Sequence, residues 1–136
     1  MSWVVDTCVL IDVLEDDPTF GSSSANLLEK VLRDGLVLCP VTMVELSPAF
    51  DGSLETQKHF LEQVGIVFTE GWTFSDTECA YRAWNTYVQA RRTSDTPKRP
   101  LADLLIGAFA CRYQGLITRN PGDFRRWFPK LKLRQP

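Results

Sequence analysis

The 136-residue sequence has little histidine, no closely spaced cysteines and no long apolar run. Its one histidine, His59, argues against a zinc site or a ribonuclease mechanism built on imidazoles. No stretch approaches the roughly 18 apolar residues of a membrane span, and the first residues lack a signal-peptide pattern. The four cysteines form no Cys-x-x-Cys pair and sit in apolar surroundings, so we predict buried, reduced thiols in a cytoplasmic protein. They are Cys8, Cys39, Cys79 and Cys111.

Basic residues are scarce in the first part of the chain. Residues 1–80 contain 3 basic and 14 acidic side chains, a net charge of −11. Residues 81–136 contain 12 basic and 3 acidic side chains, a net charge of +9, which leaves −2 for the whole chain. Such asymmetry indicates a polyanionic partner, although solvated surface charges distributed unevenly would give the same totals.

Short apolar segments alternate with helical patterns along the sequence. We expect strands at residues 2–5, 36–39, 66–68 and 116–118, and a further one at 131–133. Helices are expected from Ser23 or Ser24 onward, with Leu28, Val31 and Leu32 buried, and then at 42–50, 54–64, 76–92 and 101–113. This order predicts an α/β fold, a single domain over residues 1–136, with a mainly parallel sheet of four to five short strands and helices on both faces.

Four acidic residues lie either in segments that follow predicted strands or within predicted helices. Asp6 directly follows the first strand, and Asp123 lies in the segment that leaves the fourth. Glu45 lies in the short helix after the second strand, and Asp103 is the only charge between residues 101 and 111. Taken singly, each has an ordinary explanation: a turn or helix cap for Asp6 and Asp123, the helix dipole for Asp103, and a solvated surface for Glu45.

The four acids taken together point to a metal site. Ligands of parallel sheets bind at the carboxyl ends of the strands, so these acids are expected to converge. Two carboxylates about 4 Å apart repel by roughly 4 kcal/mol at an effective dielectric constant near 20. Oxygen ligands suit hard cations such as Mg²⁺ or Mn²⁺. Such an ion beside a basic segment fits cleavage of phosphodiesters by activated water.

Four segments containing these acids resemble PIN domains, in the order and spacing of that family. They are residues 4–12, 44–46, 100–110 and 116–124. Within the family, the length is similar to that of the VapC toxins of type II toxin–antitoxin pairs. The resemblance implies an Mg²⁺- or Mn²⁺-dependent endoribonuclease that is inhibited by a cognate antitoxin and forms a homodimer.

The resemblance also implies roles for individual residues. The catalytic, metal-binding quartet would be Asp6, Glu45, Asp103 and Asp123, with Asp6 and Asp103 as the principal ligands. Polar support would come from Thr7, Thr118 and Asn120, although Thr118 also fits an ordinary strand residue. Two positions depart from the family: Cys8 stands where many relatives have serine, and Pro48 is expected to kink the chain after Glu45.

Basic and aromatic residues lie next to two of the four acids in the sequence. The candidate contacts to RNA phosphates are Arg91, Arg92, Lys98, Arg99, Arg119, Arg125 and Arg126. Trp127 and Phe128 fit stacking on unpaired bases, and equally packing against the core or a second subunit. An antitoxin peptide would use an apolar groove and a few basic anchors, and the same arginines could serve it.

Two other functions compete with the nuclease. A non-catalytic module would use the acidic pocket and the basic half to bind a partner protein or nucleic acid. The presence of all four acids argues against such a module, because a site that has lost its catalytic activity is expected to have lost one of its acids. A phosphatase with Asp6 as nucleophile would resemble an Asp-x-Asp pair, but residue 8 is cysteine.

Overall fold

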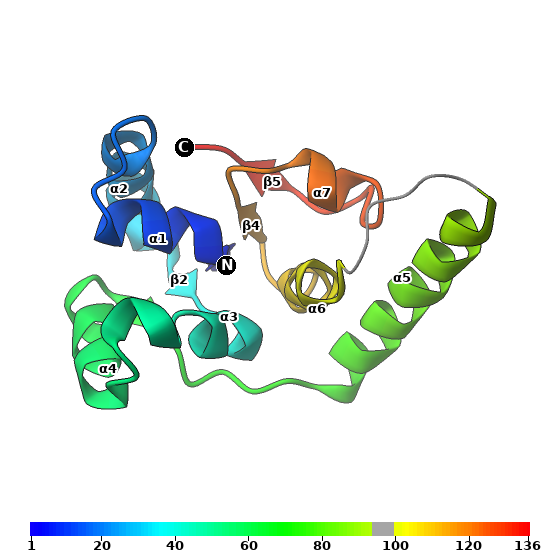
Figure 1. The fold of residues 1–136 in the computed structure, drawn as a ribbon, viewed down its shortest axis with the longest axis horizontal. Coiled ribbons are helices and arrows are strands. Elements are labelled where there is room, and N and C mark those ends of the chain that lie inside the picture. The colour runs from blue at the N-terminus through cyan, green and yellow to red at the C-terminus, as the bar shows by residue number, and fades with distance from the viewer. Residues whose placement is uncertain (94–99) are drawn as a thin grey trace.

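The computed structural model describes residues 1–93 and 100–136, which form five short strands and the helices around them (Figure 1). All paired strands are parallel, in the order β3-β2-β1-β4-β5. The strands are β1 (Trp3–Val5), β2 (Leu36–Val37), β3 (Ile66–Val67), β4 (Gly115–Ile117) and β5 (Leu133–Arg134). The predicted α/β class and parallel sheet are confirmed.

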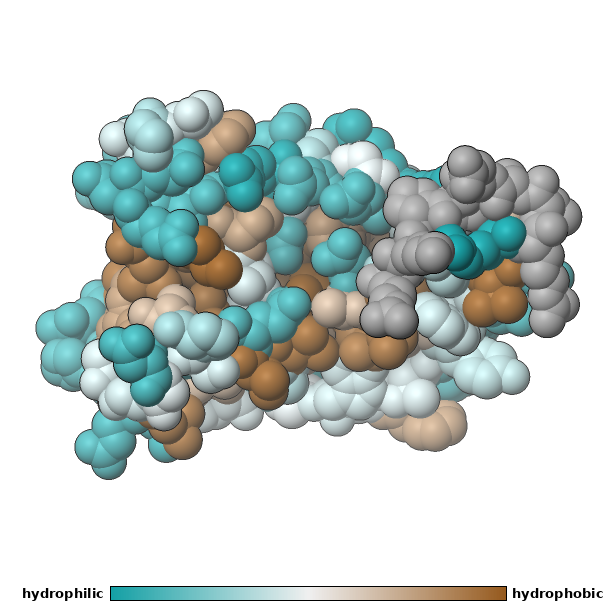
Figure 2. All heavy atoms as spheres, viewed as in Figure 1, coloured by the Kyte–Doolittle hydropathy of each residue, from teal (hydrophilic) through white to brown (hydrophobic). Residues whose placement is uncertain are grey.

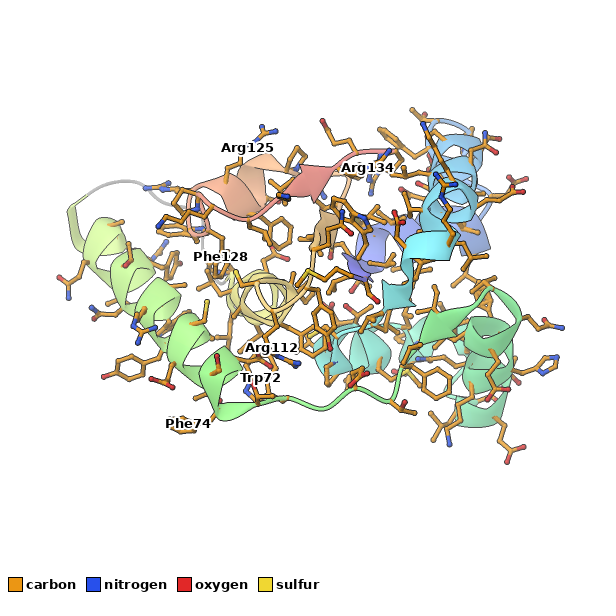
Figure 3. All side chains as sticks on the ribbon, turned by 180° about the vertical axis from the view of Figure 1, so that it is seen from behind. Trp72, Phe74, Arg112, Arg125, Phe128 and Arg134 are labelled. Carbon is orange, nitrogen blue, oxygen red and sulfur yellow. The ribbon has the colours of Figure 1, made fainter. Side chains whose placement is uncertain are left out.

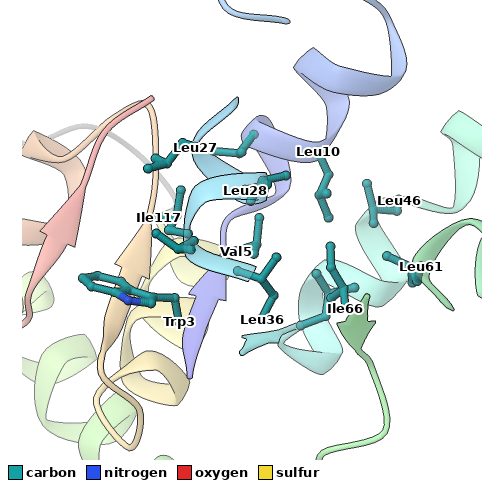
Figure 4. Packing of buried hydrophobic residues seen from close by; sticks show 13 residues of the cluster. Trp3, Val5, Leu10, Leu27, Leu28, Leu36, Leu46, Leu61, Ile66 and Ile117 are labelled. Atoms are coloured by element: carbon teal, nitrogen blue, oxygen red, sulfur yellow. The ribbon is translucent and has the colours of Figure 1, made fainter. Parts of the chain in front are cut away.

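Successive strand residues face opposite sides of the sheet and feed two different apolar clusters. Val5 and Ile117 pack with residues of α1 (Thr7–Leu14), α2 (Gly21–Val31) and α4 (Leu54–Gln63), as Figure 4 shows. Their chain neighbours Val4 and Leu116 pack instead with α6 (Leu101–Ala110). This alternation, which follows from the two-residue period of a strand, places helices on both faces of the sheet.

The long helix α5 (Phe74–Thr93) forms an outer layer on α6. Ala80, Ala83 and Tyr87 of α5 pack against α6 and Phe128. A Cβ added at Gly107 of α6 would collide with the Phe128 ring, so the C-terminal segment depends on glycine at this position.

An ion pair joins the beginning of α5 to the end of α6. Arg112 donates from Nε to Oδ1 of Asp76 at 2.8 Å and from Nη2 to Oδ2 at 2.9 Å. Its guanidinium also lies over the Phe109 ring, beside Trp72 (Figure 3). Asp76 accepts a further bond from the Thr73 backbone nitrogen and thereby caps α5. The buried carboxylate of Asp76 is therefore paired with a partly exposed cation of the same chain.

The connection after β2 is broken in the way that Pro48 predicts. Helix α3 (Pro40–Glu45) ends before Pro48, and a 3₁₀ turn, η2 (Ser47–Phe50), replaces its continuation. A second 3₁₀ turn, η1 (Leu32–Asp34), follows α2, and the short helix α7 (Gly122–Arg125) follows β4. None of the helices within residues 1–93 and 100–136 has the length and apolar content needed to cross a membrane.

Some local predictions are wrong. Residues 7–14 form a helix that we did not predict. Helix α2 begins at Gly21 rather than at a serine cap, because Asp17 already accepts the Phe20 backbone N–H at 2.7 Å. Leu32 is 42% exposed because the chain has left the α-helical path there. The cysteines are free, as predicted, but only Cys39 is buried; Cys111 is exposed.

Candidate active site

The carboxyl ends of β1 and β4 bring Asp6 and Thr118 side by side. The two strands are parallel neighbours, and the Asp6 backbone nitrogen donates to the carbonyl oxygen of Ile117 at 2.9 Å. Thr118 donates from Oγ1 to Oδ2 of Asp6 at 2.7 Å. Both side chains are buried. The parallel pairing of β1 and β4 therefore brings Asp6 into contact with Thr118, one of the residues expected to support the site.

Asp6 is held in place by two further donors. As the N-cap of α1 it accepts the Thr7 backbone N–H at Oδ1, 2.8 Å away, and the Cys8 thiol lies 3.3 Å from Oδ2. Burial raises the pKa of Asp6 above its usual value, and these hydrogen bonds offset only part of that rise. Burial also raises the pKa of the Cys8 thiol to about 11, so the thiol keeps its proton and remains a weak donor.

Asn120 completes the ring of polar groups around Thr118. Its backbone nitrogen donates to Thr118 Oγ1 at 3.0 Å, and its Nδ2 lies 3.9 Å from the Cys8 sulfur. The Thr118 hydroxyl therefore accepts one hydrogen bond, from Asn120, and donates one, to Asp6. Cys8, which the sequence marked only as a departure from the family, touches the same group of side chains.

Glu45 joins the site through Thr7 rather than through another acid. Thr7 donates from Oγ1 to Oε1 of Glu45 at 2.6 Å. Thr7 Oγ1 also lies 3.0 Å from Oγ1 of Thr42, a fully buried side chain. We did not predict Thr42 from the sequence. The signal was present, because residues three apart on a helix share a face and Thr42 precedes Glu45 by three.

Asp103 lies half-buried in the first turn of α6 and faces negative charge. Burial first, and then the charges of Asp6, Asp123 and Glu45, raise its pKa from the usual 3.8 to about 6. Asp123 itself is exposed, in α7. These effects indicate that three other carboxylates, each from a different segment, lie within electrostatic reach of Asp103.

Among the side chains that the structure describes, none forms an ion pair with these four acids. The ion pairs found there involve Asp12, Asp76 and Glu78 and none of the four acids. No three His, Cys, Asp or Glu side chains of the described residues stand close enough together to hold an ion as they are. Charges act on one another well beyond ligand distance, so the effects on the pKa of Asp103 arise from acids that, in the described part of the chain, lie too far apart to share one ion.

The basic residues predicted to bind RNA fall into four groups. Arg125 and Arg126 are exposed beside Asp123, and the guanidinium of Arg126 lies over the Trp127 ring. Arg119 points elsewhere: its Nε lies 3.3 Å from Oδ2 of the buried Asp12, although without hydrogen-bond geometry. Arg91 is exposed near the end of α5. Lys98, Arg99 and the side chain of Arg92 lie outside the described part of the structure.

The aromatic residues near the C-terminus belong to the interior. Phe128 is buried in the cluster between α5 and α6, and Trp127 meets the Tyr87 ring edge-on at a centroid distance of 5.6 Å. Packing within the chain therefore accounts for both residues. In contrast, Phe74 is 77% exposed and points away from the body of the molecule (Figure 3).

An apolar surface lies next to the Glu45 side of the site. Figure 2 shows hydrophobic residues gathered over α1 and α3 on the face in view. Val44, the neighbour of Glu45 in α3, is 73% exposed, and Ile11, Val13 and Leu14 of α1 are only partly buried. Exposed apolar surface of this kind marks places where partners bind.

Comparison with known proteins agrees with this fold. The family model of the PIN domain matches residues 3–127, so the chain belongs to the PIN domain family. Its structure is similar to a chain in the crystal structure of VapBC2 from Rickettsia felis bound to a DNA fragment from their promoter. The TM-score is 0.65 at 19% identity, covering 100% of this chain and 99% of the other. A search of curated proteins finds no match.

Proposed function

We propose that the protein is a metal-dependent endoribonuclease and the toxin of a type II toxin–antitoxin pair. Two features of this PIN domain support the proposal. The charges of three acids, Asp6, Asp123 and Glu45, all raise the pKa of Asp103, and none of the four has an ion pair among the described side chains. Uncompensated oxygen donors in a partly buried place favour a divalent cation.

In this proposal the four acids hold Mg²⁺ or Mn²⁺, with Asp6 and Asp103 as principal ligands and Glu45 and Asp123 completing the set. The ion would polarise the RNA phosphate and lower the pKa of a bound water. Thr118, Cys8 and the Thr7 backbone fix the orientation of Asp6, so that this carboxylate needs no rearrangement.

The remaining charges and surfaces suit the proposed partners. Arg125 and Arg126 would contact RNA phosphates beside Asp123, independently of sequence. The structural neighbour is a VapBC2 complex, which supports an antitoxin partner for this chain as well. We propose that the antitoxin covers the apolar surface over α1 and α3, where Val44 is exposed, and that the protein acts as a homodimer in the cytoplasm.

RNA cleavage by the purified, antitoxin-free protein tests the proposal. We expect cleavage of a structured RNA with Mg²⁺ or Mn²⁺, and none with EDTA. Asp103→Asn should reduce the rate more than about 100-fold, because losing groups that merely support a metal ligand already costs about 10–100-fold. Glu62→Gln, on the exposed face of α4, is the matched control and should cleave at the wild-type rate. Equal rates for Asp103→Asn and the wild type would reject the assigned site.

One observation favours a second function, a non-catalytic binding module. In the described part of the structure, no three of the acids lie close enough together to bind one metal ion. A module of this kind would bind RNA or a partner protein with the same affinity in EDTA and in Mg²⁺, and would leave the RNA intact. Measuring binding and cleavage in the same samples separates the two functions.

A further inference from the structure

Three side chains form a hydrogen-bonded row from the interior to the acidic site. Thr42 in α3 is fully buried, Thr7 at the beginning of α1 is half-buried, and Glu45 at the end of α3 is exposed. The Oγ1 atoms of the two threonines are 3.0 Å apart, and Thr7 Oγ1 is 2.6 Å from Glu45 Oε1. The row therefore connects two helices that are far apart in the sequence.

The chemistry of the groups decides which one donates. An ionised carboxylate only accepts hydrogen bonds, so Thr7 must give its single hydroxyl proton to Glu45. Thr7 Oγ1 has donor geometry toward both Thr42 Oγ1 and Glu45 Oε1, but it carries a single proton. With that proton on the Glu45 side, the contact between the two threonines is made by the Thr42 hydroxyl, which then donates to Thr7 Oγ1. Each hydroxyl therefore donates one hydrogen bond: Thr42 to Thr7, and Thr7 to Glu45.

Glu45 needs such a restraint. It is exposed at the last residue of α3, and its charge acts unfavourably on both Asp6 and Asp103. Repulsion and side-chain entropy both favour turning Glu45 away from the site into water. Within the described structure, the bond from Thr7 is the one side-chain hydrogen bond found that opposes this movement.

We infer that Thr42 is a positioning residue: its buried hydroxyl aims the Thr7 hydroxyl at Glu45 and so keeps Glu45 beside Asp6 and Asp103. The value of this arrangement for catalysis rests on the proposed function. Its geometry does not, and it can be tested without RNA and without metal.

The first test measures side-chain conformation in the metal-free protein. Three-bond scalar couplings should show one χ1 rotamer for Thr7 and Glu45 in the wild type and in Thr42→Ser, which keeps the hydroxyl. In Thr42→Val, and in Thr42→Ala if the valine variant does not fold, both couplings should become averaged. Ser24→Ala removes a buried hydroxyl elsewhere and should change neither coupling. Wild-type couplings in Thr42→Val would overturn the inference.

The second test links the row to ion binding. Thr42→Val should weaken the binding of Mn²⁺ to the RNA-free protein about 10-fold, the lower end of the effect of a group that orients a metal ligand, and Thr42→Ser should restore it. In a Glu45→Gln background, Thr42→Val should have no further effect. A full 10-fold loss in that background would overturn the inference. If the wild type neither binds Mn²⁺ nor cleaves RNA, the proposed function fails, while the couplings still decide on Thr42.

Discussion

Asp76 and Asp103 are acids in the first turns of two helices that pack together, yet their pKa values move in opposite directions. Burial tends to raise the pKa of Asp76, but hydrogen bonds from Arg112 and Thr73 outweigh it and lower the pKa below its usual value. The pKa of Asp103 is raised to about 6, by burial first and then by three other carboxylates.

The difference in pKa distinguishes an acid whose charge is neutralised within the fold from an acid whose charge is not neutralised by any described side chain. Asp76 has its cation built into the chain, because Arg112 binds both of its oxygens. Asp103 has no ion pair among the described residues, and the largest effects on its pKa are all unfavourable to its charge. We conclude that Asp76 belongs to the scaffold. In the proposed function, the Asp103 group takes its cation from solution.

The largest expected effect on stability is at Asp76. Asp76→Asn should lower the free energy of unfolding by about 2–4 kcal/mol, because breaking a buried ion pair costs about 3–5 kcal/mol and Arg112 is partly exposed. Chemical denaturation would measure it. Glu78→Gln, which breaks an exposed ion pair with Arg82 on the same helix, should cost less than about 1 kcal/mol. Similar losses for the two variants would contradict the assignment of Asp76 to the scaffold.

The contribution of Asp76 should depend on pH in one direction. Its folded-state pKa is below the unfolded value of 3.8, so its charge stabilises the fold fully above that value and progressively less as pH falls through the folded pKa. The difference in stability between wild type and Asp76→Asn should therefore stay constant from pH 7 to about 5 and shrink below pH 4. A difference that grows on acidification would mean that the sign is wrong.

Asp103→Asn should have the opposite effect on the metal-free protein. The pKa of the Asp103 carboxyl group is raised from 3.8 to about 6, so at pH 7.5 its negative charge is unfavourable in the folded protein. Removing that charge relieves the repulsion, and the variant should be more stable than the wild type. We expect about 1 kcal/mol, given about 1.4 kcal/mol per pKa unit and partial exposure, or ~3–5 °C in Tm. Thermal unfolding in EDTA measures this shift. A lower Tm would place Asp103 with Asp76, as part of the scaffold.

The smallest effect is expected at the basic residues beside the site. Arg125→Ala with Arg126→Ala should reduce the slope of log K against log salt for single-stranded RNA by up to about 1.4, since each phosphate contact contributes about 0.7. Arg82→Ala is the control, an exposed arginine on the outer helix α5. Equal slopes for all three proteins would mean that the uneven charge of the chain has no role in RNA binding.

Sequence alone predicted the parallel sheet because strand and helix periodicities differ clearly. It missed α1 because residues 7–14 are rich in β-branched side chains, which also suit a strand. In the structure Asp6 caps this helix and also accepts a hydrogen bond from Thr118. Helix capping and the proposed role as a metal ligand therefore apply to the same carboxylate.

The site was predicted less completely than the fold. Hydrogen bonds join five of the predicted site residues, directly or through one another: Asp6, Thr7, Glu45, Thr118 and Asn120. Arg119 was expected to face RNA, whereas its guanidinium lies over Phe20 and near Asp12. The spacing of Thr42 and Glu45 on one helix is visible in the sequence, but their contacts with Thr7 are not. Those contacts and the orientation of Arg119 depend on how α1 is placed against other segments.

Calorimetric titration of Mn²⁺ into the RNA-free protein tests the central claim most directly, namely that Asp103 belongs to a carboxylate group completed by a cation from solution. Wild type and the exposed-surface control Glu62→Gln should bind with the same affinity, and Asp103→Asn should bind at least about 10-fold more weakly. Binding of equal affinity by wild type and Asp103→Asn would contradict the claim.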